Sequence, residues 1–193
     1  MVTVVNMSEL KVHEYKDYDD YVEAQTDANK RKLGWQFKKE DHVKWIKQKQ
    51  LAANNIICHG TRNGGEQKIF QKYYPDAYII GTEISETATQ FEMTIQHDFA
   101  IPKAEWIGKF DILYSNAFDH SFEPIKTIET WKKQLSPDGK MFIEWYEFHN
   151  SKSSPSDPVS GTTREFMNFL ISHEITIEEI NKQFKLLVCT FKK

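Results

Sequence analysis

The sequence predicts an α/β protein whose doubly wound, mostly parallel sheet carries helices on both faces. Three observations predict this fold class. Short apolar runs alternate with segments of helical spacing from Ile56 to the end of the chain. The first apolar run stops at a glycine-rich turn, residues 59–65, and a helical segment and a second apolar run follow it. The last two apolar runs are separated by residues 181–183, which indicates an antiparallel C-terminal strand closing the sheet.

The N-terminal quarter is expected to be helical after a short arm. Residues 1–14 show no clear period and are expected to form a loose arm. Residues 15–50 are rich in charged and aromatic side chains and show helical spacing twice, with a break near Gly34. We therefore expect two amphipathic helices, which form an N-terminal cap that helps to cover a ligand. Residues 51–193 then form the core of the same single domain.

The core is expected to alternate strands and helices. The expected strands lie at residues 56–58, 78–81, 94–97, 110–115, 140–148, 174–180 and 184–191, and helices follow the glycine turn and lie at 86–93, 123–135 and 163–173. Pro137, followed by Asp138 and Gly139, predicts a turn before the fifth strand, since proline presets φ and glycine accepts positive φ. Residues 150–163 are rich in serine and proline and are expected to form a mobile loop.

Composition argues against several classes of protein. A net charge of -3 argues against a nucleic-acid surface, and the lysines between residues 30 and 49 alternate with acids, as on a solvated helix face. No apolar run approaches the roughly 20 residues that a membrane helix needs, and the N-terminus lacks a signal-peptide pattern. Cys58 and Cys189 lie in apolar runs, which is typical of buried thiols in a reducing cytoplasm. No cysteine or histidine spacing predicts a metal site.

The segment from Ile56 to Ser85 predicts a nucleotide-binding crevice. Its order of strand, glycine loop, helix, strand and acid places a ligand at the carboxyl ends of parallel strands. Glu83 follows the glycine loop by about 20 residues, where a carboxylate accepts hydrogen bonds from ribose hydroxyls. An acid at this position can instead cap the positive end of the next helix.

Five short motifs follow one another along the core. They are the glycine loop with Gly60 and Gly64, residues 81–85, residues 97–99, residues 110–116, and the turn at 135–139. In this order they resemble the motifs of the class I S-adenosylmethionine-dependent methyltransferases, specifically the small single-domain kind. The resemblance covers most of the chain from Ile56 onward. It implies a Rossmann-like fold, S-adenosylmethionine as cofactor, and methyl transfer to a small-molecule or sugar-like acceptor.

The same resemblance implies a set of cofactor contacts. These come from His59, Gly60, Thr61, Arg62, Gly64, Glu66, Glu83, Ile84, Asp98, Phe99 and Asn116. Glu83 would hold both ribose hydroxyls, and Asp98 would meet the adenine amino group, although residues 97–98 could equally be turn residues.

Two residues depart from the family pattern. Cys58 stands where the family usually has an acid, and Arg62 replaces its middle glycine. We expect Glu66 to take the place of the missing acid toward the methionine amino group, and His59 or Arg62 to contact the methionine carboxylate. A water-facing loop residue is the alternative for Arg62.

The acceptor is expected beside the residues that follow the fourth strand. Asn116, Asp119 and His120 lie there, and we assign catalytic roles to Asn116 and His120. A histidine side chain titrates near neutrality and could act as general base on a hydroxyl or an amine; the alternative is a polar loop residue. Displacement at a sulfonium needs positioning rather than a metal or a covalent nucleophile. Residues 144–149 at the end of the fifth strand could line the acceptor pocket.

Two other functions stay open from the sequence. A short NAD-dependent oxidoreductase would use the same crevice, but Gly60-Thr61-Arg62 breaks its Gly-x-Gly pattern. A non-catalytic domain that uses the fold for partner binding would explain the loss of the acid at Cys58.

Overall fold

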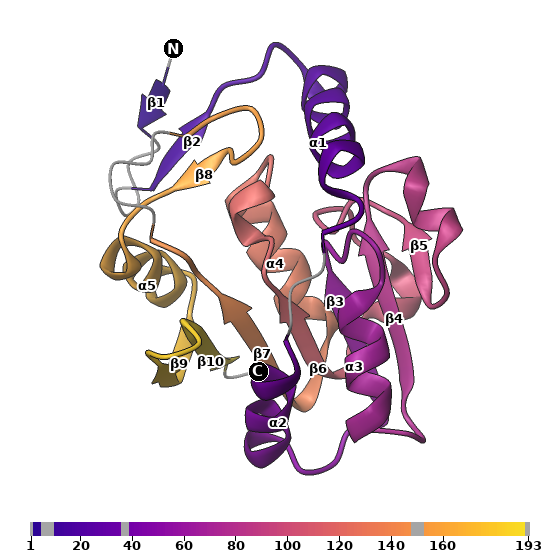
Figure 1. Cartoon of the computed structure of the whole chain (residues 1–193). Coiled ribbons are helices and arrows are strands. Elements are labelled where there is room, and N and C mark those ends of the chain that lie inside the picture. Colours follow the sequence, from indigo (N-terminus) through magenta and orange to yellow (C-terminus); the bar gives the residue numbers. More distant parts are fainter. Residues whose placement is uncertain (1, 5–9, 36–38, 148–152, 192–193) are drawn as a thin grey trace.

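The computed structural model describes residues 2–4, 10–35, 39–147 and 153–191 (Figure 1). Its main sheet has seven strands in the order β5-β4-β3-β6-β7-β10-β9. These strands are β3 Asn55–His59, β4 Tyr78–Glu83, β5 Thr94–Gln96, β6 Phe110–Ser115, β7 Leu135–Glu144, β9 Ile175–Asn181 and β10 Leu186–Phe191. β5, β4, β3, β6 and β7 pair in parallel, whereas β10 pairs antiparallel with β7 and β9. The predicted sheet with its antiparallel C-terminal hairpin is confirmed.

The described residues form five α-helices, of which α1 and α5 begin with a side-chain cap. They are α1 Tyr18–Lys32, α2 Glu40–Lys49, α3 Gly65–Tyr73, α4 Pro124–Gln134 and α5 Thr163–Ser172, with the short 3₁₀ helices η1 Glu86–Gln90, η2 Ala104–Trp106 and η3 Phe118–His120. The Asp17 side chain accepts from the Asp20 N–H before α1, and Thr162 and Glu165 form a capping box at α5. Among the described residues, no helix has the length and apolar character that crossing a membrane requires.

Helices cover both faces of the sheet, as the alternation in β3 requires. Ile57 belongs to a buried cluster that contains α4 and α5 side chains. Ile56 and Cys58 point the other way, into a cluster that includes Val43 of α2 and Phe70 of α3. Successive side chains of a strand face opposite sides, so a strand covered on both sides is apolar throughout. This explains the unbroken apolar run from which the fold class was predicted.

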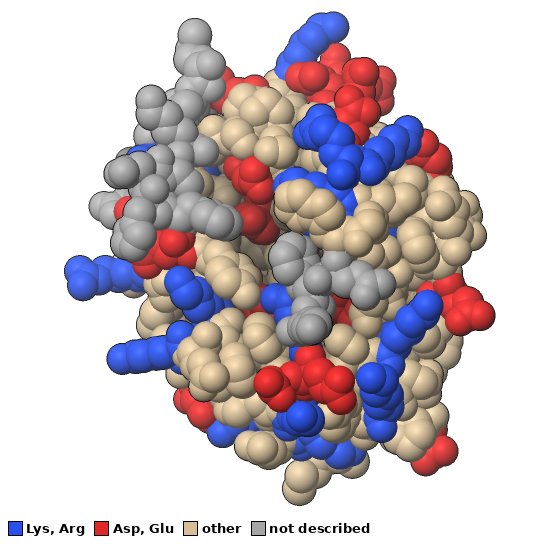
Figure 2. All heavy atoms as spheres, in the orientation of Figure 1, with Lys and Arg blue, Asp and Glu red and all other residues tan. Residues whose placement is uncertain are grey.

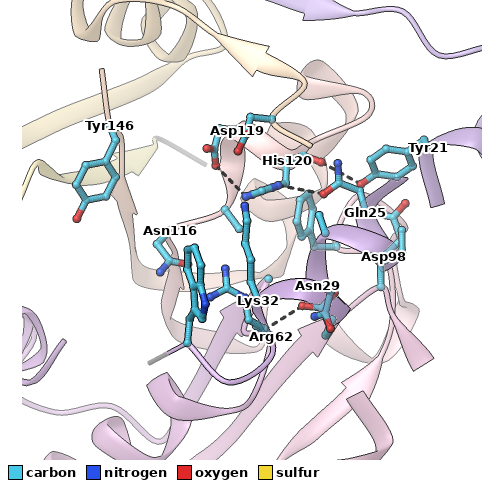
Figure 3. A pocket seen from close by; sticks show the side chains of 18 residues that line it. Tyr21, Gln25, Asn29, Lys32, Arg62, Asp98, Asn116, Asp119, His120 and Tyr146 are labelled. Atoms are coloured by element: carbon cyan, nitrogen blue, oxygen red, sulfur yellow. Dashed lines mark hydrogen bonds and ion pairs between the residues drawn. The ribbon is translucent and has the colours of Figure 1, made fainter. Parts of the chain in front are cut away.

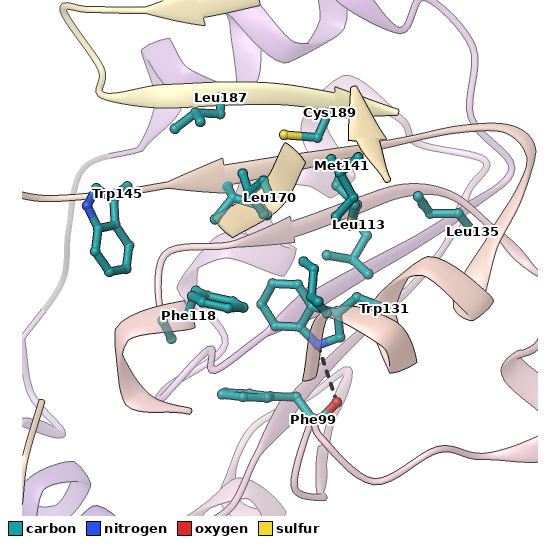
Figure 4. Close-up of a cluster of buried hydrophobic side chains, with 14 of the residues drawn as sticks. Phe99, Leu113, Phe118, Trp131, Leu135, Met141, Trp145, Leu170, Leu187 and Cys189 are labelled. Carbon is teal, nitrogen blue, oxygen red and sulfur yellow. Dashed lines mark hydrogen bonds between the residues drawn. The ribbon is translucent and has the colours of Figure 1, made fainter. Parts of the chain in front are cut away.

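Trp131 of α4 holds the core together beneath the carboxyl end of β3 (Figure 4). Its indole is fully buried and stacks on the His59 ring, with centroids 5.0 Å apart and an interplanar angle of 14°. Its Nε1–H donates to the Phe99 carbonyl at 3.2 Å, and its ring meets Phe118 edge to face. One side chain thus fixes the segments that follow β3, β5 and β6.

A second, three-stranded sheet corrects the expectation of a loose N-terminal arm. It consists of β1 Val2–Val4, β2 Lys11–His13 and β8 Val159–Ser160, in the order β1-β2-β8. The prediction of a loose arm is wrong for β1 and β2, and the expected mobile loop contains β8. The His13 N–H also donates to the Pro158 carbonyl at 2.8 Å. Pairing between segments so far apart in the chain leaves no local period, which is why the sequence did not indicate it.

The fifth parallel strand is displaced from its predicted bounds. The expected turn at 136–139 lies inside β7, where the pairing with β6 jumps from Phe110↔Leu135 to Ile112↔Lys140. Residues 136–139 therefore form a bulge in the strand rather than a turn before it. A Cβ on Gly139 would lie 2.5 Å from the Phe110 carbonyl oxygen, so only glycine fits there. The strand ends at Glu144, and residue 148 lies outside the described residues.

We predict that Trp131→Ala lowers the free energy of unfolding by about 3–5 kcal/mol, because it empties a fully buried site. Ile171→Ala on α5 is the matched control, since Ile171 is 58% exposed and should change stability by less than about 0.5 kcal/mol. Urea unfolding of both variants measures the difference. Equal losses of unfolding free energy in the two variants would contradict a role of Trp131 in stabilising the core.

Candidate functional site

A cavity of about 510 Å³ lies at the carboxyl ends of β3, β4 and β6 (Figure 3). We call it the main cavity, and its volume suits a small molecule or a nucleotide cofactor. It is lined by Tyr21, Gln25, Ala28, Asn29, Lys32, Trp35, Gly60, Arg62, Glu83, Ile84, Asp98, Phe99, Asn116, Ala117, Asp119, His120, Tyr146 and Asp157. Figure 2 shows a hollow near the middle of the face drawn, with acidic side chains at its edge.

The glycine loop brings backbone to the floor of the main cavity. Gly60 has φ of 71°, and a Cβ there would lie 2.3 Å from the Ala117 Cβ, so only glycine allows this close approach. Arg62 also has a positive φ, 50°, which glycine adopts at lower cost. The position where the family pattern has a glycine thus keeps a glycine-like backbone, although its side chain is cationic.

Two carboxylates mark one end of the main cavity. Glu83 is buried, and its oxygens accept from the Arg62 N–H at 3.0 Å and the Ser85 N–H at 3.2 Å. Asp98 accepts from the Tyr18 hydroxyl at 2.7 Å and the Ala100 N–H at 2.8 Å. Each acid is held in place by backbone donors, so it presents a preorganised acceptor to a ligand.

The hydrogen bonds of Asn29 in α1 indicate whether the residues at the Glu83 end of the cavity fit a ribose. Its Oδ1 accepts from the Thr87 hydroxyl at 2.8 Å, while its Nδ2, though buried, has no hydrogen-bond partner among the described residues. A buried donor without a partner is costly, unless a ligand supplies an acceptor. Asn29 and Glu83 line the same cavity, so a ligand with hydroxyl groups can accept from the one and donate to the other. These residues fit a nucleoside.

A second hollow of about 660 Å³, the side hollow, continues past Gly60, Arg62 and Asn116. Glu66 lies on its wall near the start of α3, and burial raises the pKa of this carboxyl to about 7. The Asn116 Nδ2 donates to Glu66 Oε1 at 3.4 Å. A carboxyl that titrates near neutrality is well placed to gain from a cationic ligand.

His120 occupies the opposite end of the main cavity, in η3. Its Nδ1 lies 3.0 Å from Gln25 Oε1, and its Nε2 lies 3.8 Å from Asp119 Oδ1. Ligand atoms of Asp119, His120 and Asp157 all lie within 4.8 Å of one another, a spacing that could also hold a metal ion. The sequence could not indicate this group, because Asp157 is distant in the chain.

A buried ionic cluster joins the cap to the sheet behind the cavity. The Glu144 carboxylate at the end of β7 is bonded by Lys39 Nζ at 2.5 Å, His42 Nδ1 at 2.7 Å and the Tyr146 hydroxyl at 2.9 Å, and by the Tyr114 hydroxyl. Of this group only Tyr146 lines the main cavity. Glu144 is thus a structural carboxylate rather than a wall of the acceptor pocket.

The structure gathers most of the site residues expected from the sequence. Gly60, Arg62, Glu83, Ile84, Asp98, Phe99, Asn116 and His120 line the main cavity, and Thr61 and Glu66 line the side hollow.

His59 and Gly64 line neither space. The His59 ring nitrogens contact Thr82 Oγ1 and Gln134 Oε1, and burial lowers its pKa to about 3. Its imidazole is therefore neutral and turned into the core, which corrects the expectation that it meets the methionine carboxylate. Gly64 instead begins α3 with φ of 71°.

Other expected acceptor residues lie elsewhere. Trp145 stacks on Phe166 with centroids 4.1 Å apart and packs in the core, and Glu147 accepts from Thr163. His149 lies outside the described residues.

Sequence reasoning missed the wall that α1 supplies. Tyr21, Gln25, Ala28, Asn29 and Lys32 all face the main cavity from one side of this helix. Their spacing of four, three, one and three is a helix face, but its mostly polar residues did not distinguish a ligand-facing side from a solvated one.

Comparisons with known proteins place the fold. No protein-family model matches the chain, and no curated protein matches it. The solved structure of 1,6-didemethyltoxoflavin-N1-methyltransferase from Burkholderia thailandensis matches 100% of this chain and 99% of its own with a TM-score of 0.71 at 10% identity. The chain has the fold of S-adenosylmethionine-dependent methyltransferases.

Two further structures with this methyltransferase fold support the assignment. A sugar N-methyltransferase from Streptoalloteichus matches 86% of this chain and 92% of its own, with a TM-score of 0.65 at 12% identity. A SAM-dependent methyltransferase from Aquifex aeolicus matches 85% and 95%, with a TM-score of 0.63 at 15% identity. The Burkholderia enzyme was crystallised with S-adenosylhomocysteine.

We predict that Glu66→Gln stabilises the ligand-free protein at pH 8 much more than at pH 5. The pKa of Glu66 rises from its ordinary 4.5 to about 7 on folding. The folded protein therefore loses stability, relative to the unfolded chain, as pH rises from about 4.5 through 7. Glutamine removes this loss, and the gain at pH 8 should exceed that at pH 5 by about 2–3 kcal/mol. Urea unfolding at both pH values measures it, with exposed Glu92→Gln as control. The same change at both pH values would contradict the prediction.

Proposed function

We propose that this protein is an S-adenosylmethionine-dependent methyltransferase that acts on a small-molecule or sugar-like acceptor. The main cavity carries the proposal: it joins a nucleoside-binding end at Glu83 and Asn29 to a polar end at His120, in a chain with the methyltransferase fold. We also propose a cytoplasmic location, which the free, buried thiols of Cys58 and Cys189 support.

The adenosine half of the cofactor fits the end of the cavity lined by the two acids. Glu83 would accept from the ribose hydroxyls, with Asn29 as a donor beside it. Asp98 would accept from the adenine amino group. Ile84 and Phe99 supply apolar surface for the base, and the Gly60 backbone leaves room for the chain that leads to sulfur.

The methionine half would reach the side hollow. Glu66 is the carboxylate available for its ammonium group now that Cys58 stands in the usual acid's place. Arg62 lines both spaces and is the cation available for its carboxylate. Thr61 and Asn116 border the same passage.

Methyl transfer requires the protein mainly to position the acceptor against the methyl group. The cofactor supplies an electrophilic methyl group bound to a positively charged sulfur. The chain holds the acceptor in line with that group, and α1 covers the site against water. His120 takes a proton from the acceptor, and Asn116 offers a hydrogen bond at the same mouth.

Calorimetric titration with S-adenosylhomocysteine, with NAD as control, tests the proposal. We expect micromolar binding of S-adenosylhomocysteine and none of NAD. Binding of neither would favour a non-catalytic domain, and binding of NAD alone would favour an oxidoreductase.

We predict that Glu83→Ala weakens S-adenosylhomocysteine binding by about 1.5–3 kcal/mol, because it removes a charged acceptor from the ribose. Glu92→Ala, which alters an exposed acid, should leave the dissociation constant unchanged. Calorimetry of both variants gives the comparison. An unaltered dissociation constant in Glu83→Ala would remove Glu83 from the cofactor site.

We predict that the wild-type protein binds S-adenosylhomocysteine more tightly as pH rises from 6 to 8. Ionised Glu66 attracts the ligand's ammonium group, whereas neutral Glu66, present below its pKa of about 7, does not. The gain should be about three- to tenfold and should vanish in Glu66→Gln. A pH dependence that survives in the variant would assign it to another group.

A further inference from the structure

The acceptor end of the main cavity carries information about what the protein methylates. The inference below rests on the proposed function and concerns Asp119, His120 and Asp157. All three line the main cavity, and Figure 3 shows Asp119 and His120 at its wall.

A chain of hydrogen bonds fixes the proton on His120. Gln25 Nε2 donates to the Pro155 carbonyl at 3.0 Å, and a carbonyl can only accept, so the amide orientation of Gln25 is set. Its Oε1 therefore faces His120 Nδ1 at 3.0 Å and must receive a proton from it. In the neutral ring, Nε2 then carries the lone pair.

The backbone of His120 is fixed from the same helix. The Tyr21 hydroxyl donates to the His120 carbonyl oxygen at 3.1 Å. Both the ring and the main chain of His120 are thus held by α1, and the Nε2 lone pair has a defined direction, toward Asp119.

Three acceptor groups gather there, and the Lys32 ammonium group acts on Asp119 from the same cavity. His120 Nε2 lies 3.8 Å from Asp119 Oδ1, and a ligand atom of Asp157 lies within 4.8 Å of both side chains. Asp157 is held from the side by the Ser156 hydroxyl at 2.7 Å. A lone pair and two carboxylates in one place call for a partner that brings several N–H donors and positive charge.

The charge of the whole cavity points the same way. Four carboxylate side chains line it, those of Glu83, Asp98, Asp119 and Asp157, against the two cations Lys32 and Arg62. The cofactor carries a net charge of about one positive unit, from sulfonium, ammonium and carboxylate groups. Carboxylates therefore remain in excess over cations in the main cavity, which favours a cationic acceptor.

We propose that the acceptor is a primary or secondary amine that binds as its ammonium ion between Asp119 and Asp157. The ammonium gives one proton to His120 Nε2 and so frees the nitrogen lone pair. That lone pair forms the new C–N bond to the methyl carbon, while the electron pair of the C–S bond stays on sulfur. The products are S-adenosylhomocysteine and the N-methylated ammonium ion, and His120 later gives its proton to water.

Two synthetic probes test this without knowledge of the natural acceptor. Both are S-adenosylhomocysteine analogues in which nitrogen replaces sulfur; one carries a 2-aminoethyl arm on it and the other a 2-hydroxyethyl arm. The arm reaches from the sulfur position toward the acceptor end. Calorimetry in buffer with EDTA, and again with MgCl2, gives the dissociation constants.

We expect the aminoethyl probe to bind at least about tenfold more tightly than the hydroxyethyl probe, because its ammonium group makes a charge-assisted contact. Asp119→Asn and Asp157→Asn should each reduce the ratio of the two dissociation constants at least about fivefold. The dissociation constant of each variant for S-adenosylhomocysteine should stay within about twofold of wild type. Binding of S-adenosylhomocysteine also shows that the variants fold. Asp19→Asn, an exposed acid on α1, is the matched control and should keep the full ratio.

Three outcomes would overturn the inference. Equal binding of the two probes, or a ratio that survives in both variants, would show that no ammonium is held there. Tighter binding of the hydroxyethyl probe only with MgCl2 would assign the three side chains to a metal ion. Failure of S-adenosylhomocysteine itself to bind would instead overturn the proposed function.

Discussion

The whole site depends on the close approach of two backbone segments, at Gly60 after β3 and Ala117 after β6. A single Cβ on Gly60 would collide with Ala117 at 2.3 Å. The Gly60 and Thr61 N–H groups both donate to the Thr82 carbonyl, which ties the same loop to β4. The loop, the Glu83 carboxylate and the segment that carries His120 are therefore joined in one frame, which holds the two ends of the cavity in place.

Two sets of contacts, of different chemistry, help to fasten the cap to this frame. Near the start of α2, Lys39 and His42 bond the buried carboxylate of Glu144. In α1, Tyr18 and Tyr21 bond Asp98 and the His120 backbone. A buried ionic cluster adds little net stability, since desolvation offsets the attraction, but it tolerates only one arrangement of its partners. We infer that it fixes where the cap lies rather than how strongly it is held.

The mostly parallel sheet, its antiparallel hairpin and the residues at the Glu83 end of the cavity could be predicted because their signals are local. Apolar runs such as that ending at Cys58, the glycine loop, and the acid at Glu83 each lie within one short segment. The sequence also predicts Asp119 and His120 at the acceptor end. It does not predict Gln25 or Asp157 there, since these two residues come from distant parts of the chain. The expectation for His59 was wrong for a related reason. A histidine beside a glycine loop looks like a cofactor-binding residue, and only its stacking on Trp131 in the folded protein shows that it belongs to the core.

The small sheet supports one end of the cavity separately from the main sheet. β2 and β8 pair there, and Tyr15, Gln25 and His13 bond the carbonyls of Pro155 and Pro158. Asp157 thus rests on a scaffold that the main sheet does not share, whereas Glu83 and the glycine loop belong to that sheet. Under the proposed function, substitutions in residues 153–160 would change the acceptor side of the cavity at Asp157 and leave the strands that carry Glu83 and the glycine loop unaltered.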